Sequence, residues 1–86
     1  MTEDARSATL LEFLHREVVK DRRRPLDLDT ALVSSGLVDS MSLINVLAFV
    51  EDSFGVVIPD EAATAESMNT PRSILALVRA FEGRSR

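Results

Sequence analysis

The sequence predicts an all-α domain, a four-helix bundle of three main helices and one short helix, with a long loop between the first and second helices. Apolar residues recur at helical spacing in three segments, and residues that cap or break helices stand at the ends of these segments. The β-branched run Val56-Val57-Ile58 is too short to predict a sheet. At 86 residues the chain is expected to form a single domain, with its core over about residues 8–82 and short flexible termini.

The first helix is predicted from about Ala5 to Lys20. Its apolar residues fall on one stripe of an amphipathic helix: Leu10, Leu11, Leu14 and Val18. The run Arg22-Arg23-Arg24-Pro25 ends the helix, because arginines favour the negative end of a helix dipole and proline does not continue a helix. We interpret these arginines as a solvated helix end. A nucleic-acid site is disfavoured, since the run has no aromatic neighbours and the rest of the surface is acidic.

A long loop is predicted from Leu26 to Val38, where no helical period persists and Ser34, Ser35 and Gly36 interrupt the chain. A loop of this length in so small a domain is usually functional. Four leucines of the loop are expected to enter the core: Leu26, Leu28, Leu32 and Leu37.

The second helix is predicted from Ser40 to about Ser53, with Asp39 as its N-cap. One apolar stripe is expected to face the core: Leu43, Val46, Leu47, Val50 and Phe54. A second stripe points well away from the core and consists of Met41, Ile44 and Ala48. We interpret the second stripe as a docking surface for another protein; the alternative is that the loop or the short helix covers it. The sequence does not show what buries Phe49, which falls near the face opposite the core.

The remaining elements follow Gly55, which is expected to end the second helix before Val56–Pro59 crosses the core as extended chain. The short helix is predicted to start at Pro59-Asp60-Glu61, because proline and acidic residues suit the first turn of a helix. The last helix is predicted to start at Thr70-Pro71, with Thr70 as its cap. Its apolar stripe consists of Ile74, Leu77, Val78 and Phe81.

The composition excludes several kinds of site. The chain has no cysteine and a single histidine, His15, so it supplies no thiol, and neither a metal site nor a catalytic triad is expected. We therefore assign no catalytic residue and expect a protein that is not an enzyme. A chain of this length is also too small to enclose a deep active site.

The net charge is −4, and the segment between Pro25 and Pro71 contains acidic residues but no lysine or arginine. An anionic surface repels nucleic acid and attracts basic surfaces of partner proteins, although a solvated acidic face is also a common way to keep a small domain in solution. The N-terminal residues lack the pattern of a secretory signal, and no apolar run is long enough for a membrane span. These features predict a cytoplasmic protein, and we expect it to be a monomer.

Ser40 is the residue to which the sequence assigns a function. As the first residue of a helix it lies among unpaired backbone N–H groups at the positive end of the helix dipole, where a phosphate ester is well tolerated. The alternative is that Asp39 and Ser40 are ordinary capping residues. A serine hydrolase is disfavoured, because Ser40 lacks the flanking glycines of a nucleophile elbow and nothing in the sequence pairs His15 with it.

From about Leu10 to Phe81 the chain resembles the acyl carrier protein family. The family's attachment motif is an aspartate, the modified serine, and a leucine or methionine, which matches Asp39-Ser40-Met41 after Gly36-Leu37. Two later segments are similar in the expected order. Glu51-Asp52-Ser53-Phe54-Gly55 resembles the acidic end of the family's second helix, and Ile58-Pro59-Asp60-Glu61 resembles the start of its short third helix.

The resemblance implies that Ser40 carries 4′-phosphopantetheine, attached covalently from coenzyme A by a separate Mg-dependent phosphopantetheinyl transferase, with Asp39 as helix cap and transferase contact. The imported thiol would hold acyl or aminoacyl groups as thioesters, loaded by a ligase and passed to ketosynthase or condensation enzymes. The resemblance also assigns partner recognition and a shallow acyl cleft. Recognition falls to Met41, Ile44, Ala48, Glu51 and Asp52, and Ile58 and Ala63 flank the cleft.

Two features bear on the pathway. Ser42 and Asn45 stand where fatty-acid carriers often have acids, which disfavours recognition by the enzymes of fatty-acid synthesis. The segment from Thr64 to Pro71 is similar to discrete carriers of natural-product and aminoacyl pathways. We therefore expect a carrier in polyketide or nonribosomal peptide biosynthesis. The alternatives are a fatty-acid or D-alanyl/aminoacyl carrier, and an unmodified helical adaptor with the carrier fold.

Overall fold

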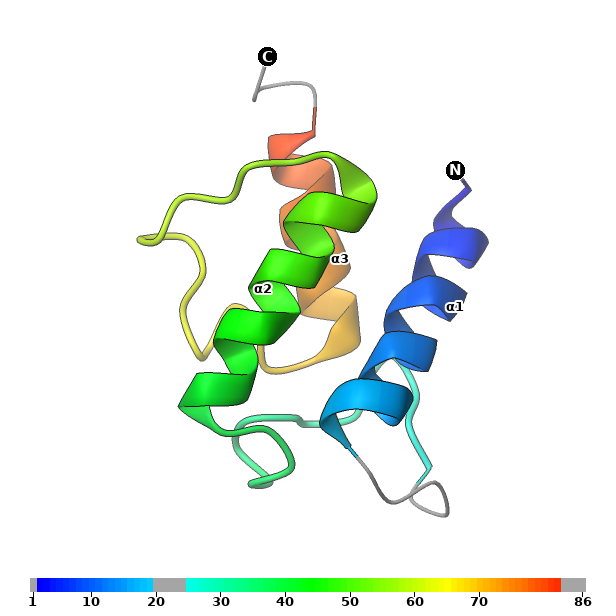
Figure 1. The fold of residues 1–86 in the computed structure, drawn as a ribbon, viewed down its shortest axis with the longest axis vertical. Helices are drawn as coiled ribbons and strands as arrows, with labels where there is room; N and C mark the ends of the chain where they lie inside the picture. Colours follow the sequence, from blue (N-terminus) through cyan, green and yellow to red (C-terminus); the bar gives the residue numbers. More distant parts are fainter. Residues whose placement is uncertain (1, 20–24, 83–86) are drawn as a thin grey trace.

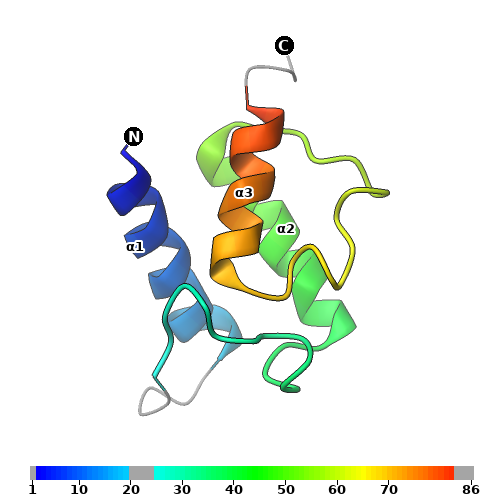
Figure 2. The same ribbon diagram turned by 180° about the vertical axis from the view of Figure 1, so that it is seen from behind.

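A computed structural model describes residues 2–19 and 25–82 of the chain. Its helices are α1 (Glu3–Phe13), which continues into the π-helical turn η1 (Leu14–Val18), α2 (Ser40–Phe54) and α3 (Pro71–Phe81). Figure 1 shows α2 in front of α3 with α1 to one side, and Figure 2 gives the view from behind. The described residues contain no strand, so the predicted all-α class is confirmed. The predicted helix end at Lys20, the arginines Arg22–Arg24 and the predicted C-terminal tail lie outside these residues.

Helix α1 begins two residues earlier than predicted and ends in a wider turn. Thr2 caps it, since its Oγ1 accepts a hydrogen bond of 3.1 Å from the backbone N–H of Ala5. Leu10 and Leu14 are fully buried, as expected for the predicted apolar stripe. The turn η1 closes with a hydrogen bond from the N–H of Val19 to the carbonyl of Leu14, and Val19 is also buried.

One hydrophobic core holds the helices and the long loop together. Of the loop leucines predicted to enter it, Leu32 is fully buried and the other three pack against the core while half-buried. The prediction that this loop contributes to the core is therefore confirmed. The buried apolar residues are Leu10, Leu14, Val19, Leu32, Val38, Val46, Val50, Val56, Ile58, Met68, Ile74, Leu75 and Val78.

Helix α2 presents the two apolar faces that the sequence predicts. Val46 and Val50 are fully buried, whereas Met41 is 73% and Ile44 is 63% exposed. Because these two side chains remain exposed, neither the long loop nor residues 59–70 covers the second stripe. Gly55 ends the helix at φ = 65°, in the left-handed region that glycine adopts without steric cost.

Phe49 belongs to an aromatic cluster that joins α1 to α2. Its ring stacks on Phe13 with centroids 3.9 Å apart and an interplanar angle of 9°. It also meets Phe54 edge to face, at 6.4 Å and 76°. The partner that the sequence left open for Phe49 is therefore the end of α1, which the helical period of α2 alone does not reveal.

The short helix predicted from Pro59 is wrong, because residues 59–70, all of which the structure describes, form turns and extended chain. Polar side chains compete here with a helical backbone. The hydroxyl of Ser67 donates to the carbonyl of Ala62 at 2.6 Å, and the hydroxyl of Thr64 accepts from the N–H of Ser67 at 3.0 Å. Such side-chain bonds offer the backbone an alternative to helix formation. The bundle thus has three α-helices in the described residues, and an irregular segment stands where the fourth was expected.

Helix α3 begins at the predicted residues with a complete capping box. Thr70 Oγ1 accepts from the N–H of Ser73 at 3.0 Å, and Ser73 Oγ accepts from the N–H of Thr70 at 3.2 Å. Pro71 occupies the first helical turn, as predicted. Ile74 and Val78 of the predicted stripe are fully buried. Within residues 2–19 and 25–82, no helix has both the length and the apolar character required to cross a membrane.

Candidate functional site

Ser40 lies at the surface, as the first residue of α2, behind a well-formed cap. The backbone of Asp39 is extended, and its Oδ1 accepts a hydrogen bond of 2.8 Å from the N–H of Ser42. That hydrogen bond holds the pKa of the Asp39 carboxyl below its usual value, so the group is a carboxylate at neutral pH. The Ser40 hydroxyl is thus presented at the positive end of a 15-residue helix beside a fixed negative charge.

The end of the long loop holds Ser40 in place from the other side. The N–H of Val38 donates to the carbonyl of Leu32 at 2.9 Å, and both of these side chains are buried. Gly36 turns the chain between them at φ = 82°, a conformation that a side chain would strain. The residues just before Ser40 are therefore anchored in the core, and they do not act as a loose tether.

A cavity of about 320 Å³ opens beside Ser40, between α2 and residues 60–68. Ala63, one of the two residues predicted to flank an acyl cleft, lies on its wall. Ile58, the other, is only 3% exposed, belongs to the core and does not line this cavity. Asp60 is the single charged side chain on a wall that is otherwise mostly apolar. The lining residues are Ser40, Leu43, Ile44, Leu47, Asp60, Ala63, Ala65 and Met68.

The outer face of α2 carries most of the residues predicted to recognise partners. Met41, Ile44, Ala48 and Asp52 are all exposed. No acidic residue lies in the first turn of this helix, so the part of the face next to Ser40 is apolar and uncharged apart from the Asp39 cap. Between Ser40 and Asp52, the exposed side chains of this face that were predicted to recognise partners are Met41, Ile44 and Ala48, none of which is charged.

A comparison with known proteins identifies the family. A D-alanyl carrier protein of Abiotrophia defectiva is 34% identical to this chain over 70 residues, which cover 81% of the chain and 82% of the relative. The chain belongs to the phosphopantetheine-type carrier-protein family. No protein-family model matches this carrier protein, and no solved structure matches it. The resemblance inferred from Asp39-Ser40-Met41 is thereby confirmed at the level of the family.

The residues of this carrier protein fit the prosthetic group that its family implies. A phosphodiester on Ser40 would lie at the N-terminus of α2, where unpaired N–H groups and the helix dipole favour negative charge. The hydroxyl is exposed, so a transferase can reach it. Ser40 would hold the group, and the cavity beside it offers apolar surface to whatever is attached.

Glu51 has a structural role in this carrier protein in addition to the one predicted for it. Its side chain is half-buried, and its Oε2 accepts a hydrogen bond of 2.9 Å from the N–H of Ile58. The carboxylate thereby ties the chain that follows Gly55 back onto the end of α2. Of the two acids predicted for partner recognition, Asp52 is therefore the one whose side chain lies exposed to a partner.

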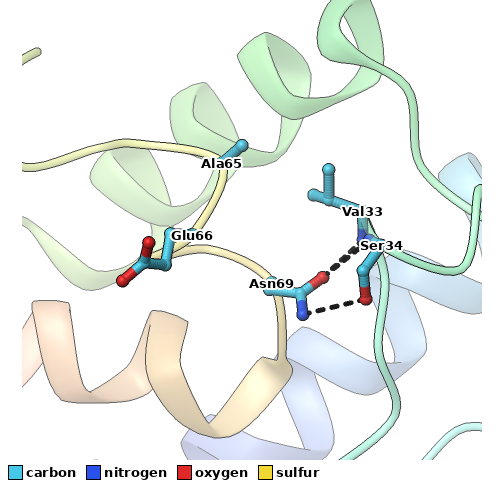
Figure 3. A pocket seen from close by; sticks show the side chains of 5 residues that line it. All are labelled: Val33, Ser34, Ala65, Glu66 and Asn69. Carbon is cyan, nitrogen blue, oxygen red and sulfur yellow. Dashed lines mark hydrogen bonds between the residues drawn. The ribbon is translucent and has the colours of Figure 1, made fainter.

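A second cavity, of about 290 Å³, lies where the long loop meets residues 65–69 and was missed by sequence reasoning (Figure 3). Asn69 Oδ1 accepts hydrogen bonds of 2.9 Å from the N–H groups of both Val33 and Ser34. Asn69 Nδ2 donates to Ser34 Oγ at 3.2 Å, and the Asn69 carbonyl accepts from the N–H of Leu32. In the sequence, Asn69 is marked only by its position immediately before the Thr70 cap.

Metal ligands are not grouped in the part of the chain that the structure describes. No set of three His, Cys, Asp or Glu side chains there is placed to hold an ion. The acidic residues of the central segment are instead distributed over the long loop, the Asp39 cap, the end of α2 and the turns before α3.

Proposed function

We propose that this protein is a carrier that holds an aminoacyl group on a 4′-phosphopantetheine arm attached to Ser40. The observation that supports this most is the position of Ser40, exposed at the first residue of α2 behind the Asp39 cap and beside a largely apolar cavity. When bound, the group supplies the thiol that this chain lacks, on which the cargo is held as a thioester. Ser40 is the nucleophile only in the modification reaction, and the chain has no catalytic role of its own.

The proposed cargo is aminoacyl because the relative is, by its name, a carrier of D-alanyl groups. The neutral first turn of α2 agrees with this, since it departs from the acidic start that fatty-acid carriers often have. Polyketide or nonribosomal peptide assembly remains the wider setting that we predict for the carrier.

The proposed partners are enzymes that act on Ser40 or on the group attached to it. They are a phosphopantetheinyl transferase, a loading ligase, and condensation or ketosynthase enzymes. We assign their docking to the exposed stripe of Met41, Ile44 and Ala48, with Asp52 beyond it. Asp39 keeps the helix start formed and places a negative charge next to the hydroxyl that the transferase must reach.

The intact mass of the protein after incubation with coenzyme A, Mg²⁺ and a broad-specificity phosphopantetheinyl transferase tests the proposal. Wild type should gain the mass of one phosphopantetheine group, and Ser40→Ala should gain none. Ser53→Ala, which removes an exposed hydroxyl from the other end of the same helix, is the matched control and should be modified like wild type. An unmodified but folded wild type would instead favour the adaptor with a carrier fold.

A further inference from the structure

We propose that the second cavity binds the phosphopantetheine arm carried by Ser40. This inference rests on the proposed function, because only a modified Ser40 has an arm to place. The cavity lies between the long loop and the irregular segment before α3, and its wall is formed by Val33, Ser34, Ala65, Glu66 and Asn69.

The two cavities adjoin each other at Ala65, which lines both. A chain that starts at Ser40 can pass along the first cavity and over the small Ala65 side chain into the second. The absence of a helix over residues 59–70 is what leaves this route, since those residues curve around the cavities as turns. The second cavity therefore continues the site that contains the attachment hydroxyl.

Two polar groups of the second cavity, the Asn69 side-chain amide and the Ser34 hydroxyl, each have a proton that can be donated to a ligand. Asn69 Nδ2 carries two protons and uses one on Ser34 Oγ, which leaves the other free to donate. Ser34 Oγ accepts that bond, so its own proton is also available. The two bonds from Val33 and Ser34 N–H groups to Asn69 Oδ1 fix the amide in this orientation (Figure 3). Two donors held side by side are suited to a ligand that presents carbonyl oxygens.

The charge of the cavity selects an uncharged ligand. Glu66 is its one ionisable lining residue, and Figure 3 shows the Glu66 carboxylate turned away from Ser34 and Asn69. No lysine or arginine occurs between Pro25 and Pro71, so nothing on these segments attracts an anion. Val33 and Ala65 add apolar surface beside the two donors. Beyond its phosphate, the phosphopantetheine arm is a neutral chain, and its distal part consists of amide groups and methylene groups, which match the two donors and the apolar surface.

Nuclear magnetic resonance of the same labelled protein before and after modification tests the inference. The amide resonances of Ser34 and Ala65 and the side-chain amide of Asn69 should shift, in addition to those next to Ser40. Contacts between methylene groups in the distal half of the unlabelled arm and the methyl groups of Val33 should appear as cross-peaks in isotope-filtered spectra. Shifts confined to the neighbours of Ser40, Ala63 and Met68 would overturn the proposal, because the arm would then stay in the first cavity or in solvent.

A bulkier side chain at position 65, where the two cavities adjoin, tests whether the arm passes from the first cavity into the second. Ala65→Leu should abolish the shifts at Ser34 and Asn69 in protein whose intact mass shows that Ser40 carries the arm. Ala80→Leu, at an exposed alanine of α3 that lines neither cavity, is the matched control and should retain the shifts. Retention of the shifts in folded Ala65→Leu would count against passage over Ala65. If the variant does not fold, the wild-type cross-peaks to Val33 decide the matter.

The mass of the sample separates this inference from the proposed function. A wild type that gains no phosphopantetheine overturns both. A wild type that gains the group without distant shifts or cross-peaks overturns only the docking site, and Ser40 remains the attachment residue.

Discussion

Replacement of Asn69 by leucine tests whether one side chain fastens the long loop to the segment before α3. The substitution removes two hydrogen bonds of 2.9 Å, from the N–H groups of Val33 and Ser34, and a weaker one of 3.2 Å to Ser34 Oγ. A typical hydrogen bond contributes about 0.5–1.5 kcal/mol, so the two short bonds together predict a loss of about 1–3 kcal/mol in the free energy of unfolding. Ser34 is exposed and water can replace its partner, which favours the lower half of that range.

Urea unfolding followed by far-ultraviolet circular dichroism measures this loss. The midpoint should fall with an unchanged slope, since the native surface stays the same. In a thermal scan the same loss lowers the melting temperature by roughly 4–8 °C per kcal/mol for a domain of this size.

Asn69→Asp is the matched control, because a carboxylate oxygen can still accept from both N–H groups. It should lose less than half as much stability as Asn69→Leu at neutral pH. A loss of under about 0.5 kcal/mol in Asn69→Leu, the range of an ordinary surface substitution, would refute the reasoning. Equal losses in the two variants would also refute it, because the accepting oxygen would then contribute nothing.

Four further predictions concern the caps and the aromatic cluster. The hydrogen bond from Ser42 lowers the pKa of Asp39 in the folded protein. The carboxylate therefore stabilises the fold above its unfolded-state pKa, and this stabilisation is lost as the pH falls through the lowered folded-state pKa. On acidification, the melting temperature should fall more steeply for wild type than for Asp39→Asn. Asp39→Ala should also slow the mass gain with the transferase, and a wild-type rate would argue against its role. Thr70→Ala should cost about 1 kcal/mol of unfolding free energy through loss of the capping box of α3, with Thr70→Ser close to wild type as the check. A double-mutant cycle of Phe13→Leu and Phe49→Leu should give a coupling of about 0.5–1.5 kcal/mol, and additive losses would show that the stacked rings do not interact.

The main helices could be predicted because their signals are local. Asp39 before Ser40, Gly55 after Phe54 and Thr70-Pro71 each act within a few residues of the element that they start or end. The two faces of α2 follow in the same way from the helical period, and their burial agrees with it. Ser40 could be placed at the head of its helix for this reason.

The features that the sequence did not reveal depend on contacts between distant residues. The stacking partner of Phe49 is Phe13, which lies on a different helix. Asn69 accepts hydrogen bonds from Val33 and Ser34, which precede it in the chain by 36 and 35 positions, and no spacing pattern in the sequence predicts that pairing. The sequence predicts Glu51 only as a surface acid, and its hydrogen bond from the Ile58 N–H is known from the structure alone. Long-range polar contacts of this kind leave no periodic signature.

The predicted short helix is absent for a local reason. Pro59, Asp60 and Glu61 are suitable for the first turn of a helix, but Thr64 and Ser67 follow and bond to nearby backbone groups. The start signal predicts a helix only where such downstream competitors are absent. The outcome bears on function, because the turns that replace the helix form one wall of both cavities.

The location of the added group is the most direct test of the central claim, that Ser40 is where this carrier receives its arm. Protein modified with coenzyme A and the transferase would be digested, and the peptide that contains Gly36–Asn45 would be fragmented in the mass spectrometer. We expect the full phosphopantetheine mass on Ser40, with Ser35 and Ser42 unmodified. The group on another serine, or no group on a folded protein, would contradict it.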